Sequence, residues 1–432
     1  MFKTLRNAWK VEEIRKKILF TLFIVLIYRL GNSVPVPYIN VETLKNYFQT
    51  ISNTVLGLMN VMSGGSFSSA TVFALSIQPY INASIIIQLL CVAIPYLERL
   101  AKDEGEEGKK KIASITRYST VGIGILQGLG YYVLLRNNSL LTTDGKSVWA
   151  AIIIIATFTA GSALLMWLGE QITEFGIGNG ISIILFVSII SRFPNTIISA
   201  VNSIRTTPGD WWIYLLMTLG ALAIIVLIIF VSKAERRVPI QYAKRVVGRK
   251  VYGGQSTYLP MQVNMSGVLP VIFASSIASL PATIAAFFRT PDEGSFWSGF
   301  LKIFDSSFWI YPFIYFLLIV FFSYFYATIQ FDPVEVANNL QKNGGYIPGF
   351  RPGKPTADFL QKILSKVTLF GALYLAVIAI TPQIISLCST KAANTGISVG
   401  GTSLIIVVGV ALETVQALEN QMLMRHYKGF LE

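Results

Sequence analysis

The sequence predicts an all-α polytopic membrane protein with ten transmembrane helices, arranged as two inverted pseudo-symmetric halves of five. Hydrophobic residues make up 53% of the 432-residue chain and charged residues only 13%, about half the charged share of an average globular domain. Ten long apolar stretches follow one another, and lysines and arginines crowd into alternate gaps between them. Because a backbone in hydrocarbon must satisfy its own hydrogen bonds, apolar stretches of about 20 residues predict membrane-spanning helices.

The predicted spans follow the apolar stretches in order. They are residues 18–37, 70–97, 113–136, 149–168, 179–199, 211–232, 263–288, 307–330, 363–388 and 398–421. With the N-terminus inside, the cytoplasmic segments carry 26 lysines and arginines and the external segments carry eight. Because short cytoplasmic loops hold an excess of basic residues, we expect a multi-pass protein of the cell membrane with both termini in the cytoplasm.

The spans divide the chain into two halves with flanking segments. The predicted units are a cytoplasmic amphipathic segment at 1–17, an N-terminal half at 18–205, a C-terminal half at 206–421 with long cytoplasmic loops at 233–262 and 331–362, and a cytoplasmic tail at 422–432. The first apolar run is long enough to span and lacks a small-residue cleavage motif. We therefore expect no removable signal peptide.

An odd number of spans per half requires the halves to lie upside-down relative to each other if they are structural repeats. The second span of each half contains prolines and carries polar residues at mid-membrane depth. These residues are Pro79, Pro95, Asn82, Ser84 and Gln88 in the first half, and Pro270, Pro281, Asn264, Ser275 and Ser276 in the second. Matching interruptions favour an interface between the repeats. The alternative is that these prolines merely kink ordinary membrane helices.

Residues 55–67 form an apolar segment that is too short to span a membrane. The run VLGLMNVM at 55–62 is followed by the glycine-rich break SGGS at 63–66. A short apolar helix on a glycine hinge either folds back into a cavity, as a moving stopper would, or lies on the outer surface. The residues alone leave both alternatives open.

The two long loops have features that membrane topology does not explain. Residues 233–262 place β-prone runs on both sides of Gly248, which predicts a basic hairpin projecting from the membrane. In residues 331–362, Asp332 and Pro333 predict a helix start, and the run NGGYIPGFRPGKPT predicts a rigid turn around Arg351. We interpret both loops as docking surfaces.

The chemistry of common enzymes and coupled transporters is missing. The chain has no H-E-x-x-H and no G-x-S-x-G, and its single histidine, His426, makes a histidine metal site improbable, so no cofactor is expected. Ionisable residues within the spans are scarce: Arg29 lies near an end, and Glu413 and Glu419 lie in the cytoplasmic half of the last span. A proton- or ion-coupled transporter usually keeps acidic residues at mid-membrane, so this deficit counts against that class. Sodium sites built from carbonyls and hydroxyls stay open as an alternative.

Several runs, in order along the chain, carry a family resemblance. They are MSGG at 62–65, ALSIQPYINASIIIQLL at 74–90, GEQITE and GIGNGIS within 169–182, QST at 255–257 and IPGFRPG at 347–353. Together they resemble the SecY family of bacterial protein-conducting channels, and the similarity extends from the first span to the last. The resemblance implies two halves that open like a clamshell around a path for polypeptides.

In that family a ring of aliphatic side chains forms the central constriction. The matching positions here are Ile77, Ile81, Ile181, Leu185, Ile272 and Ile406. Leu185 departs from the commonest residue of the family but stays aliphatic. A collar of branched apolar side chains cannot hydrate ions, and it can part around an extended chain without a specific fit. Each residue taken alone would be read as an ordinary packing or lipid-facing side chain.

The resemblance also implies a plug, a lateral gate and docking sites. The plug positions are Leu56, Leu58, Met59, Asn60, Val61, Met62, Gly64 and Gly65. The second and seventh spans match the lateral gate, where Asn82, Gln88 and Asn264 are expected contacts. Arg249 and Lys250 in the hairpin, and Arg351 in the second loop, resemble the sites that dock SecA or the ribosome. The loop containing Phe175 and Gly176 has no basic residue, so we expect no docking there.

The expected function is a passive, plug-gated polypeptide channel without catalysis of its own. The implied partners are small SecE-like and SecG-like membrane subunits, the SecA ATPase, translating ribosomes, client polypeptides with signal sequences, and the lipid bilayer. A secondary transporter of small solutes is the second hypothesis, but it would need a polar midplane site where the matched ring is wholly aliphatic. An intramembrane hydrolase is the third hypothesis, but the sequence contains neither the nucleophile motif nor the metal motif that such an enzyme needs.

Overall fold

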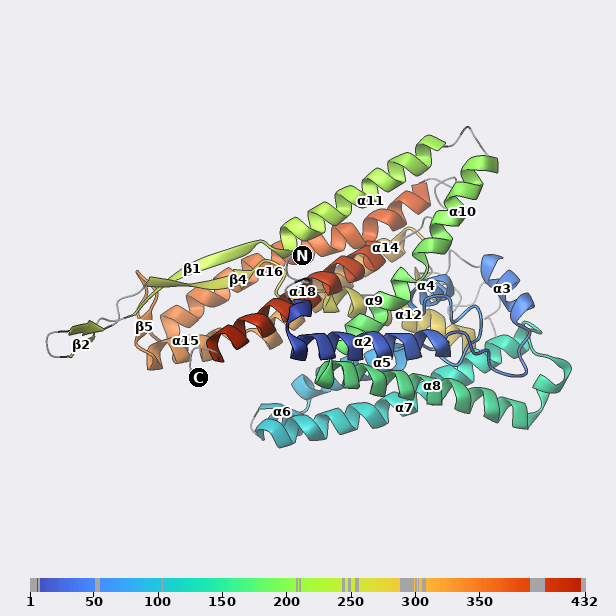
Figure 1. Cartoon of the computed structure of the whole chain (residues 1–432), viewed down its shortest axis with the longest axis horizontal. Helices are drawn as coiled ribbons and strands as arrows, with labels where there is room; N and C mark the ends of the chain where they lie inside the picture. Colours follow the sequence, from blue (N-terminus) through green and yellow to red (C-terminus); the bar gives the residue numbers. More distant parts are fainter. Residues whose placement is uncertain are drawn as a thin grey trace.

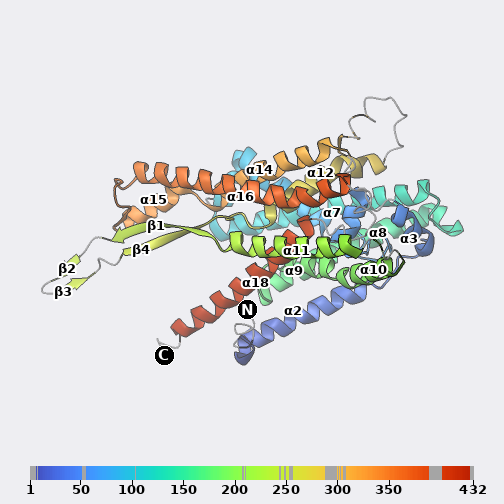
Figure 2. The same ribbon diagram turned by 90° about the horizontal axis from the view of Figure 1, so that it is seen from above.

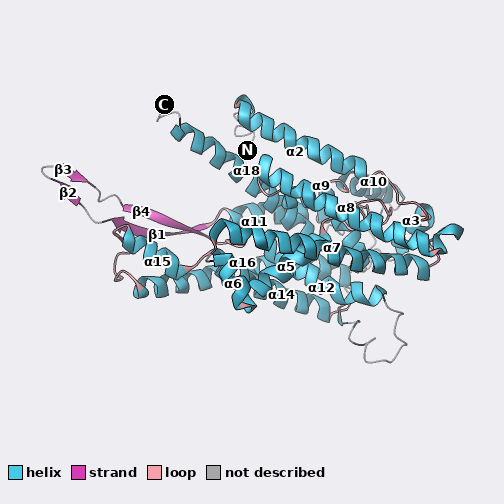
Figure 3. Cartoon of the chain, turned by 90° about the horizontal axis from the view of Figure 1, so that it is seen from below, coloured by secondary structure: helices cyan, strands magenta, loops and turns pink. Residues whose placement is uncertain are grey.

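The computed structural model describes residues 6, 8–50, 55–102, 104–206, 209, 211–242, 245–247, 250–252, 256–287, 299, 301, 303–304, 308–388 and 401–428. These residues form an elongated bundle of helices from which a β-hairpin projects at one end (Figure 1). The strands are confined to that end (Figure 3). The last helix, α18 (Gly401–Lys428), runs through the bundle toward the same end.

The described helices follow the apolar pattern of the sequence. The N-terminal half contains α2 (Glu12–Gly31), α3 (Val41–Thr50), α4 (Val55–Met62), α5 (Gln78–Ala93), α6 (Pro95–Lys102), α7 (Gly105–Asn137), the short 3-10 helix η1 (Thr143–Lys146), α8 (Val148–Phe175), α9 (Gly180–Ile190) and α10 (Phe193–Thr206). The C-terminal half contains α11 (Trp211–Ser232), α12 (Leu269–Phe287), α14 (Ile310–Gln330), α15 (Pro333–Lys342), α16 (Lys354–Cys388) and α18.

Seven helices within the described ranges are long and apolar enough to cross a membrane. They are Gly105–Asn137, Val148–Phe175, Gly180–Asn202, Trp211–Ser232, Ile310–Lys342, Lys354–Ile385 and Gly401–Leu423. The bent pair α5 and α6 gives up to one more span, and α2 and α12 occupy the positions of the first and seventh predicted spans. The chain is therefore an all-α polytopic membrane protein, as predicted.

The second predicted span, 70–97, differs from the observed structure at both ends. Residues 72–77 are turns, and the helix begins only at Gln78, with Pro79 in its first turn. At the other end, Ile94 is extended (φ −107°, ψ 116°), and α5 and α6 meet there at an angle of 106°. Because the ring of Pro95 disfavours a helical conformation in the residue before it, the helix breaks at this point.

The first predicted span, 18–37, also has different limits. Its helix α2 begins earlier, at Glu12, and ends at Gly31. Beyond this end, Pro35 forms an isolated antiparallel β-bridge with Thr71. The short helix α3 that follows was not predicted, because its sequence VETLKNYFQT has no apolar run of spanning length.

The predicted basic hairpin is confirmed. Strand β1 (Glu235–Tyr242) pairs antiparallel with β4 (Ser256–Gln262), with Val238 opposite Leu259, and β2 (Arg245–Val247) pairs with β3 (Lys250–Tyr252) at the tip. The hairpin extends well beyond the helices (Figure 2). A third strand, β5 (Gly345–Tyr346), pairs with the other edge of β1. The two long loops are therefore joined in one three-stranded sheet.

The base of the hairpin is fixed to the helices by a small apolar cluster. Its buried members are Val238, Met261, Ala327, Ile347, Leu360 and Leu364, from β1, β4, α14, α16 and the turn after β5. Met261 in β4 is fully buried, whereas Tyr258 on the same strand is 59% exposed. The alternation of buried and exposed side chains thus fixes which face of the hairpin base meets the helices.

Replacing Met261 by alanine is predicted to loosen the hairpin base, because the truncation leaves a cavity in this cluster. We expect a loss of about 2–5 kcal/mol in the free energy of unfolding. Thermal unfolding in detergent would measure the loss, and faster tryptic cleavage within 235–262 would locate it. The matched control, Tyr258→Ala on the same strand, should change stability by about 0.5 kcal/mol or less. Equal effects of both substitutions would contradict the proposed packing.

Candidate functional site

The six predicted ring residues come from four different helical regions. Ile77 and Ile81 lie at the start of α5, Ile181 and Leu185 on α9, Ile272 on α12 and Ile406 on α18. Five of them are at most 5% exposed and belong to one continuous cluster of buried apolar residues. The sixth, Ile181, is half-buried and packs against the same cluster. Both halves of the chain thus contribute aliphatic side chains to one core.

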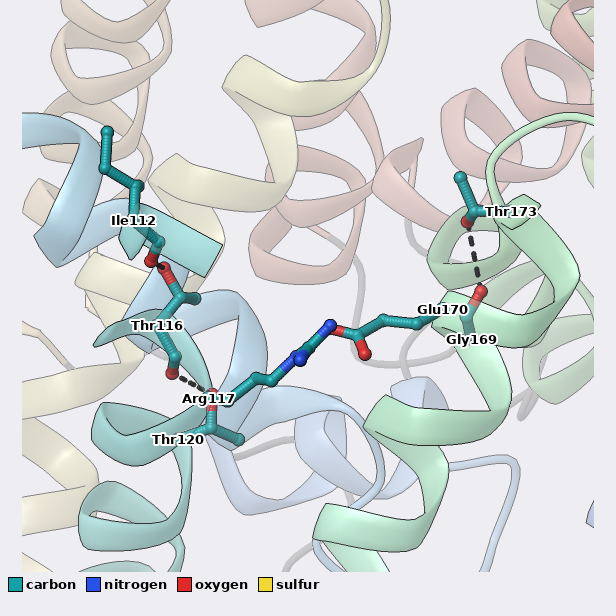
Figure 4. Close-up of polar contacts among 7 residues, drawn as sticks. All are labelled: Ile112, Thr116, Arg117, Thr120, Gly169, Glu170 and Thr173. Carbon is teal, nitrogen blue, oxygen red and sulfur yellow. Dashed lines mark hydrogen bonds and ion pairs between the residues drawn. The ribbon is translucent and has the colours of Figure 1, made fainter. Parts of the chain in front are cut away.

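Helix α9, which carries two of these residues, is held by polar contacts at its start. Asn179 caps the helix, since its side-chain oxygen accepts hydrogen bonds from the amides of Ile181 (3.0 Å) and Ser182 (3.3 Å). The hydroxyl of Thr173 on α8 accepts a bond from the amide of Gly180 (2.9 Å) and donates one to the carbonyl of Gly169 (3.0 Å). The Thr173 bond to Gly169 is drawn in Figure 4. These bonds fix the position of α9 along the axis of α8.

The α8–α9 contact is close because glycines lie on both sides of it. A Cβ at Gly180 would lie 2.0 Å from the carbonyl oxygen of Gly169. A Cβ at Gly169 would lie 2.6 Å from Cδ1 of Ile181. The close approach of the two backbones therefore places a predicted ring residue directly over α8.

The short helix α4 packs inside the bundle and not on its surface. It contacts α9 and α12, two of the helices that carry ring residues. Met59, Asn60 and Met62 are buried, and Val61 is half-buried. The side chains of Leu56 and Leu58 lie outside the described residues. The structure therefore places this segment inside the bundle, and not on the outer surface as the second alternative had it.

The turn after α4 is fixed by hydrogen bonds and by a close backbone approach. The carbonyl of Asn60 accepts from the amide of Gly65 (2.9 Å), and its side-chain oxygen accepts from the amide of Ser68 (3.0 Å). Gly64 has a φ of +69°, and a Cβ there would lie 2.7 Å from the carbonyl oxygen of Ser188 on α9. Gly65 has a φ of +88° and open space around it.

Gln78 links this segment to the helix that follows it, a contact that the sequence did not reveal. Its side-chain amide donates a hydrogen bond to the sulfur of Met62 over 3.3 Å, and both residues are buried. The only available signal was that Gln78 is a polar residue within the apolar run 74–90 and directly follows the ring position Ile77.

Two of the predicted gate residues lie on α5, and the third lies just before α12. Helix α12 contacts both α5 and α7. Asn82 on α5 is buried, and Gln88 on the same helix donates to the hydroxyl of Ser84 (3.2 Å). Asn264 lies just before α12, and its side-chain oxygen has no hydrogen-bond partner among the described residues. Gln88 and Asn264 therefore each carry a side-chain oxygen that no described residue satisfies.

The predicted docking residues are described only in part. Arg249 lies outside the described residues, and Lys250 begins β3 with a side chain that is also outside them. Arg351 is exposed on the turn before α16, and its carbonyl accepts a bond from the Thr356 hydroxyl (2.8 Å). The neighbouring rings of Phe350 and Phe359 stack with centroids 4.1 Å apart. The structure contains the turn predicted around Arg351.

An ion pair that sequence reasoning missed joins α7 to α8 (Figure 4). Nε of Arg117 lies 2.9 Å from a carboxylate oxygen of Glu170. On α7, the hydroxyls of Thr116 and Thr120 bond back to carbonyls one turn earlier, those of Ile112 and Thr116. The basic flank of the third span was visible in the sequence, but its partner 53 residues away was not.

Comparisons with known proteins agree with this arrangement. A model of the SecY family matches residues 71–415. The protein translocase subunit SecY of Streptomyces griseus is 44% identical over 442 residues, and that of Mycobacterium bovis is 41% identical over 447 residues, each alignment covering 100% of both chains.

Two solved structures share the fold at lower sequence identity. One, described as the structure of a protein conducting channel, has a TM-score of 0.66 at 16% identity and covers 94% of this chain and 92% of its own. The other, Sec61 in the canine ribosome-channel complex from the endoplasmic reticulum, has a TM-score of 0.61 at 15% identity and covers 94% and 92%. With the family match and the full-length relatives, these findings show that the chain belongs to the SecY family.

Proposed function

We propose that the six aliphatic residues on α5, α9, α12 and α18 form the constriction of a polypeptide-conducting channel, with α4 as its plug. As a member of the SecY family, the chain is a subunit of a protein translocase. The observation that carries the proposal is the convergence of aliphatic side chains from both halves on one buried cluster, with α4 packed against α9 and α12.

The aliphatic character of the ring suits this function physically. Ions cannot replace their hydration shell with branched hydrocarbon, so a closed apolar collar resists ion flow. An extended polypeptide needs no specific contacts to pass, because side chains of the collar only have to part around it. Both halves contribute to the ring, so a separation of the halves would widen it.

The contact between α5 and α12 is the proposed lateral gate. Transmembrane segments of client proteins would leave the channel for the lipid there, past Asn82, Gln88 and Asn264. The polar groups at this seam support the assignment, because a passing backbone or water can satisfy Asn264, whose side-chain oxygen has no partner among the described residues.

The sheet that joins the two long loops is the proposed docking surface. Arg249 and Lys250 in the hairpin, together with the exposed Arg351, would bind the SecA ATPase or a translating ribosome. The pairing of β1 with β5 supports a shared surface, because it links the hairpin to the strand just before the Arg351 turn. A guanidinium on a rigid turn is suited to bidentate bonds with carboxylates.

In the proposed setting the chain lies in the cell membrane with both termini in the cytoplasm. Small SecE-like and SecG-like subunits would accompany it, and its clients would be secretory and membrane polypeptides with signal sequences. The chain itself would supply the path and the gates, whereas SecA or the ribosome would supply the energy.

Disulfide crosslinking in inverted membrane vesicles tests the ring assignment. Cys91 and Cys388 are first replaced by serine, and cysteine then replaces Ile77 or Ile272. A secretory chain carrying single cysteines is stalled during transport. We expect adducts at both ring positions only when SecA and ATP are supplied, because the chain must then pass through the constriction.

Ile86→Cys provides the matched control, because Ile86 lies on α5 like Ile81 but is 44% exposed. It should form few adducts with a chain inside the channel. If the chain arrests with SecA bound and never crosslinks to either ring position, the ring assignment is wrong. If no chain engages even with SecA and ATP, the proposed partnership with SecA is wrong.

Gly64→Ala is predicted to unseat the plug. The new Cβ would lie 2.7 Å from the Ser188 carbonyl oxygen at a φ of +69°, and such overpacking costs about 1–3 kcal/mol. That cost raises the displaced population by about fivefold or more, so idle vesicles should conduct more ions than those with the unmodified chain. Ion flux into vesicles without a client chain measures the effect.

Gly65→Ala is the matched control for backbone strain, because Gly65 shares the positive φ but has nothing within 4 Å of its Cβ position. It should leak less than Gly64→Ala. Equal leakage in the two variants would mean that backbone strain in the turn causes the leakage, and that the contact between Gly64 and α9 is not what holds the plug in place. No leakage in either would mean that α4 does not seal the path.

A further inference from the structure

Glu413 is the first exposed residue of α18 along its course from Gly401. Residues 401–412 are all buried or half-buried, whereas Glu413 is exposed. It lies seven positions after Ile406, so the two side chains project from nearly the same face of the helix, about 10.5 Å apart along the axis. Glu413 is thus two turns beyond Ile406 along α18, which runs toward the end of the bundle where the hairpin projects (Figure 1).

The neighbours of Glu413 show that its side chain faces the inside of the helix bundle and not the lipid. One of its carboxylate oxygens lies 2.7 Å from where a Cβ at Gly267 would be, on the turn that leads into α12. The carboxylate also interacts electrostatically with Tyr326 on α14. An exposed carboxylate within a spanning helix is costly in hydrocarbon, and such residues face water-filled cavities as a rule.

The carboxylate has no partner of its own in the part of the chain that the structure describes. None of the ion pairs found there includes Glu413, and no side chain or backbone amide there donates a hydrogen bond to it. It therefore does not cap α12, although it lies beside the turn that precedes that helix. An unpaired carboxylate on the inner face of the proposed channel is available to bind a cation that passes through it.

We propose that Glu413 is a binding site for the basic side chains, lysine or arginine, of a polypeptide entering the channel. The inference rests on the proposed function, because it needs a polypeptide at the ring. A carboxylate beside a low-dielectric wall attracts a cation more strongly than it would in bulk water. Its position on the entry side of the ring would hold the basic start of a signal sequence while the following apolar segment reaches the seam between α5 and α12.

Glu413→Gln tests the site with two reporter proteins in vesicles that contain the complete translocase. One reporter has a signal sequence with lysines before its apolar core, and in the other these lysines are replaced by glutamine. We expect the variant to slow translocation of the basic reporter by about two- to fivefold, the effect of losing one exposed ion pair. Translocation of the neutral reporter should not change, because it has no cation to bind.

Two variants make the comparison specific. Glu413→Asp keeps the charge and should retain the preference for the basic reporter. Glu419→Gln removes an exposed carboxylate further along the same helix and should leave both reporters as they are with the unmodified chain. An equal slowing of both reporters by Glu413→Gln would assign Glu413 a structural role beside Gly267, and no slowing of either would show that it binds no client. If the unmodified chain moves neither reporter, the proposed function itself fails.

A second measurement uses the unmodified chain and does not depend on the folding of a variant. A water-soluble carbodiimide activates carboxylates, and a lysine within contact distance then displaces the activated group to form an amide bond. With the basic reporter stalled in the channel, we expect a crosslink between a lysine of its signal sequence and Glu413, identified by peptide mass. Crosslinks confined to other carboxylates would overturn the proposal.

Discussion

The need to satisfy every backbone hydrogen bond away from water governs this structure more than any single contact. Helices meet that need within themselves, but the stretch between α4 and α5 is not helical. Its amide and carbonyl groups are paired locally and with the neighbouring chain: the amide of Val36 bonds to the carbonyl of Ala70, and that of Val72 to the carbonyl of Val34. The Tyr131 hydroxyl donates to the carbonyl of Phe67 over 2.5 Å. Irregular backbone at this depth is tolerated only because it is enclosed by protein.

That enclosure explains why the proposed plug and the proposed ring belong to one packed unit. The turns that satisfy the backbone also bring α4 against α9, and they set where α5 begins, which fixes Ile77 and Ile81. The cap at Asn179 and the close contact between Gly169 and Gly180 place Ile181 and Leu185 on the facing helix in the same way. Aliphatic side chains then complete the cluster without needing polar partners of their own. The residues of the proposed ring are thus positioned by hydrogen bonds that lie around them and not between them.

Hydropathy predicted the spans well, and turn chemistry predicted the hairpin and the Asp332 helix start, because these signals are local. Residues 70–77, ATVFALSI, were wrongly placed in a helix because their composition is largely apolar, whereas Ala70 and Ser76 adopt positive φ angles of 43° and 51°. Only tertiary contacts hold alanine and serine in that region, so no local pattern reveals it. The pairing of β5 with β1 and the Arg117–Glu170 contact were likewise invisible, since each joins segments that are distant in sequence. Ring, plug and gate positions came from family resemblance; spacing alone would not have selected them.

Two of the contacts between the halves differ in their polar content. Where the N-terminal segment, the α8–α9 turn and α18 meet, the buried residues are Ala8, Ile14, Ile177 and Leu418, and opening that junction would expose apolar surface to water. Gln88 on α5 and Asn264 just before α12 each retain a buried oxygen without a hydrogen-bond partner among the described residues. An unsatisfied buried polar group costs about 1–3 kcal/mol, and opening the seam lets water or a client backbone remove that cost. In the proposed channel, this cost would favour opening near α5 and α12, where the gate is proposed.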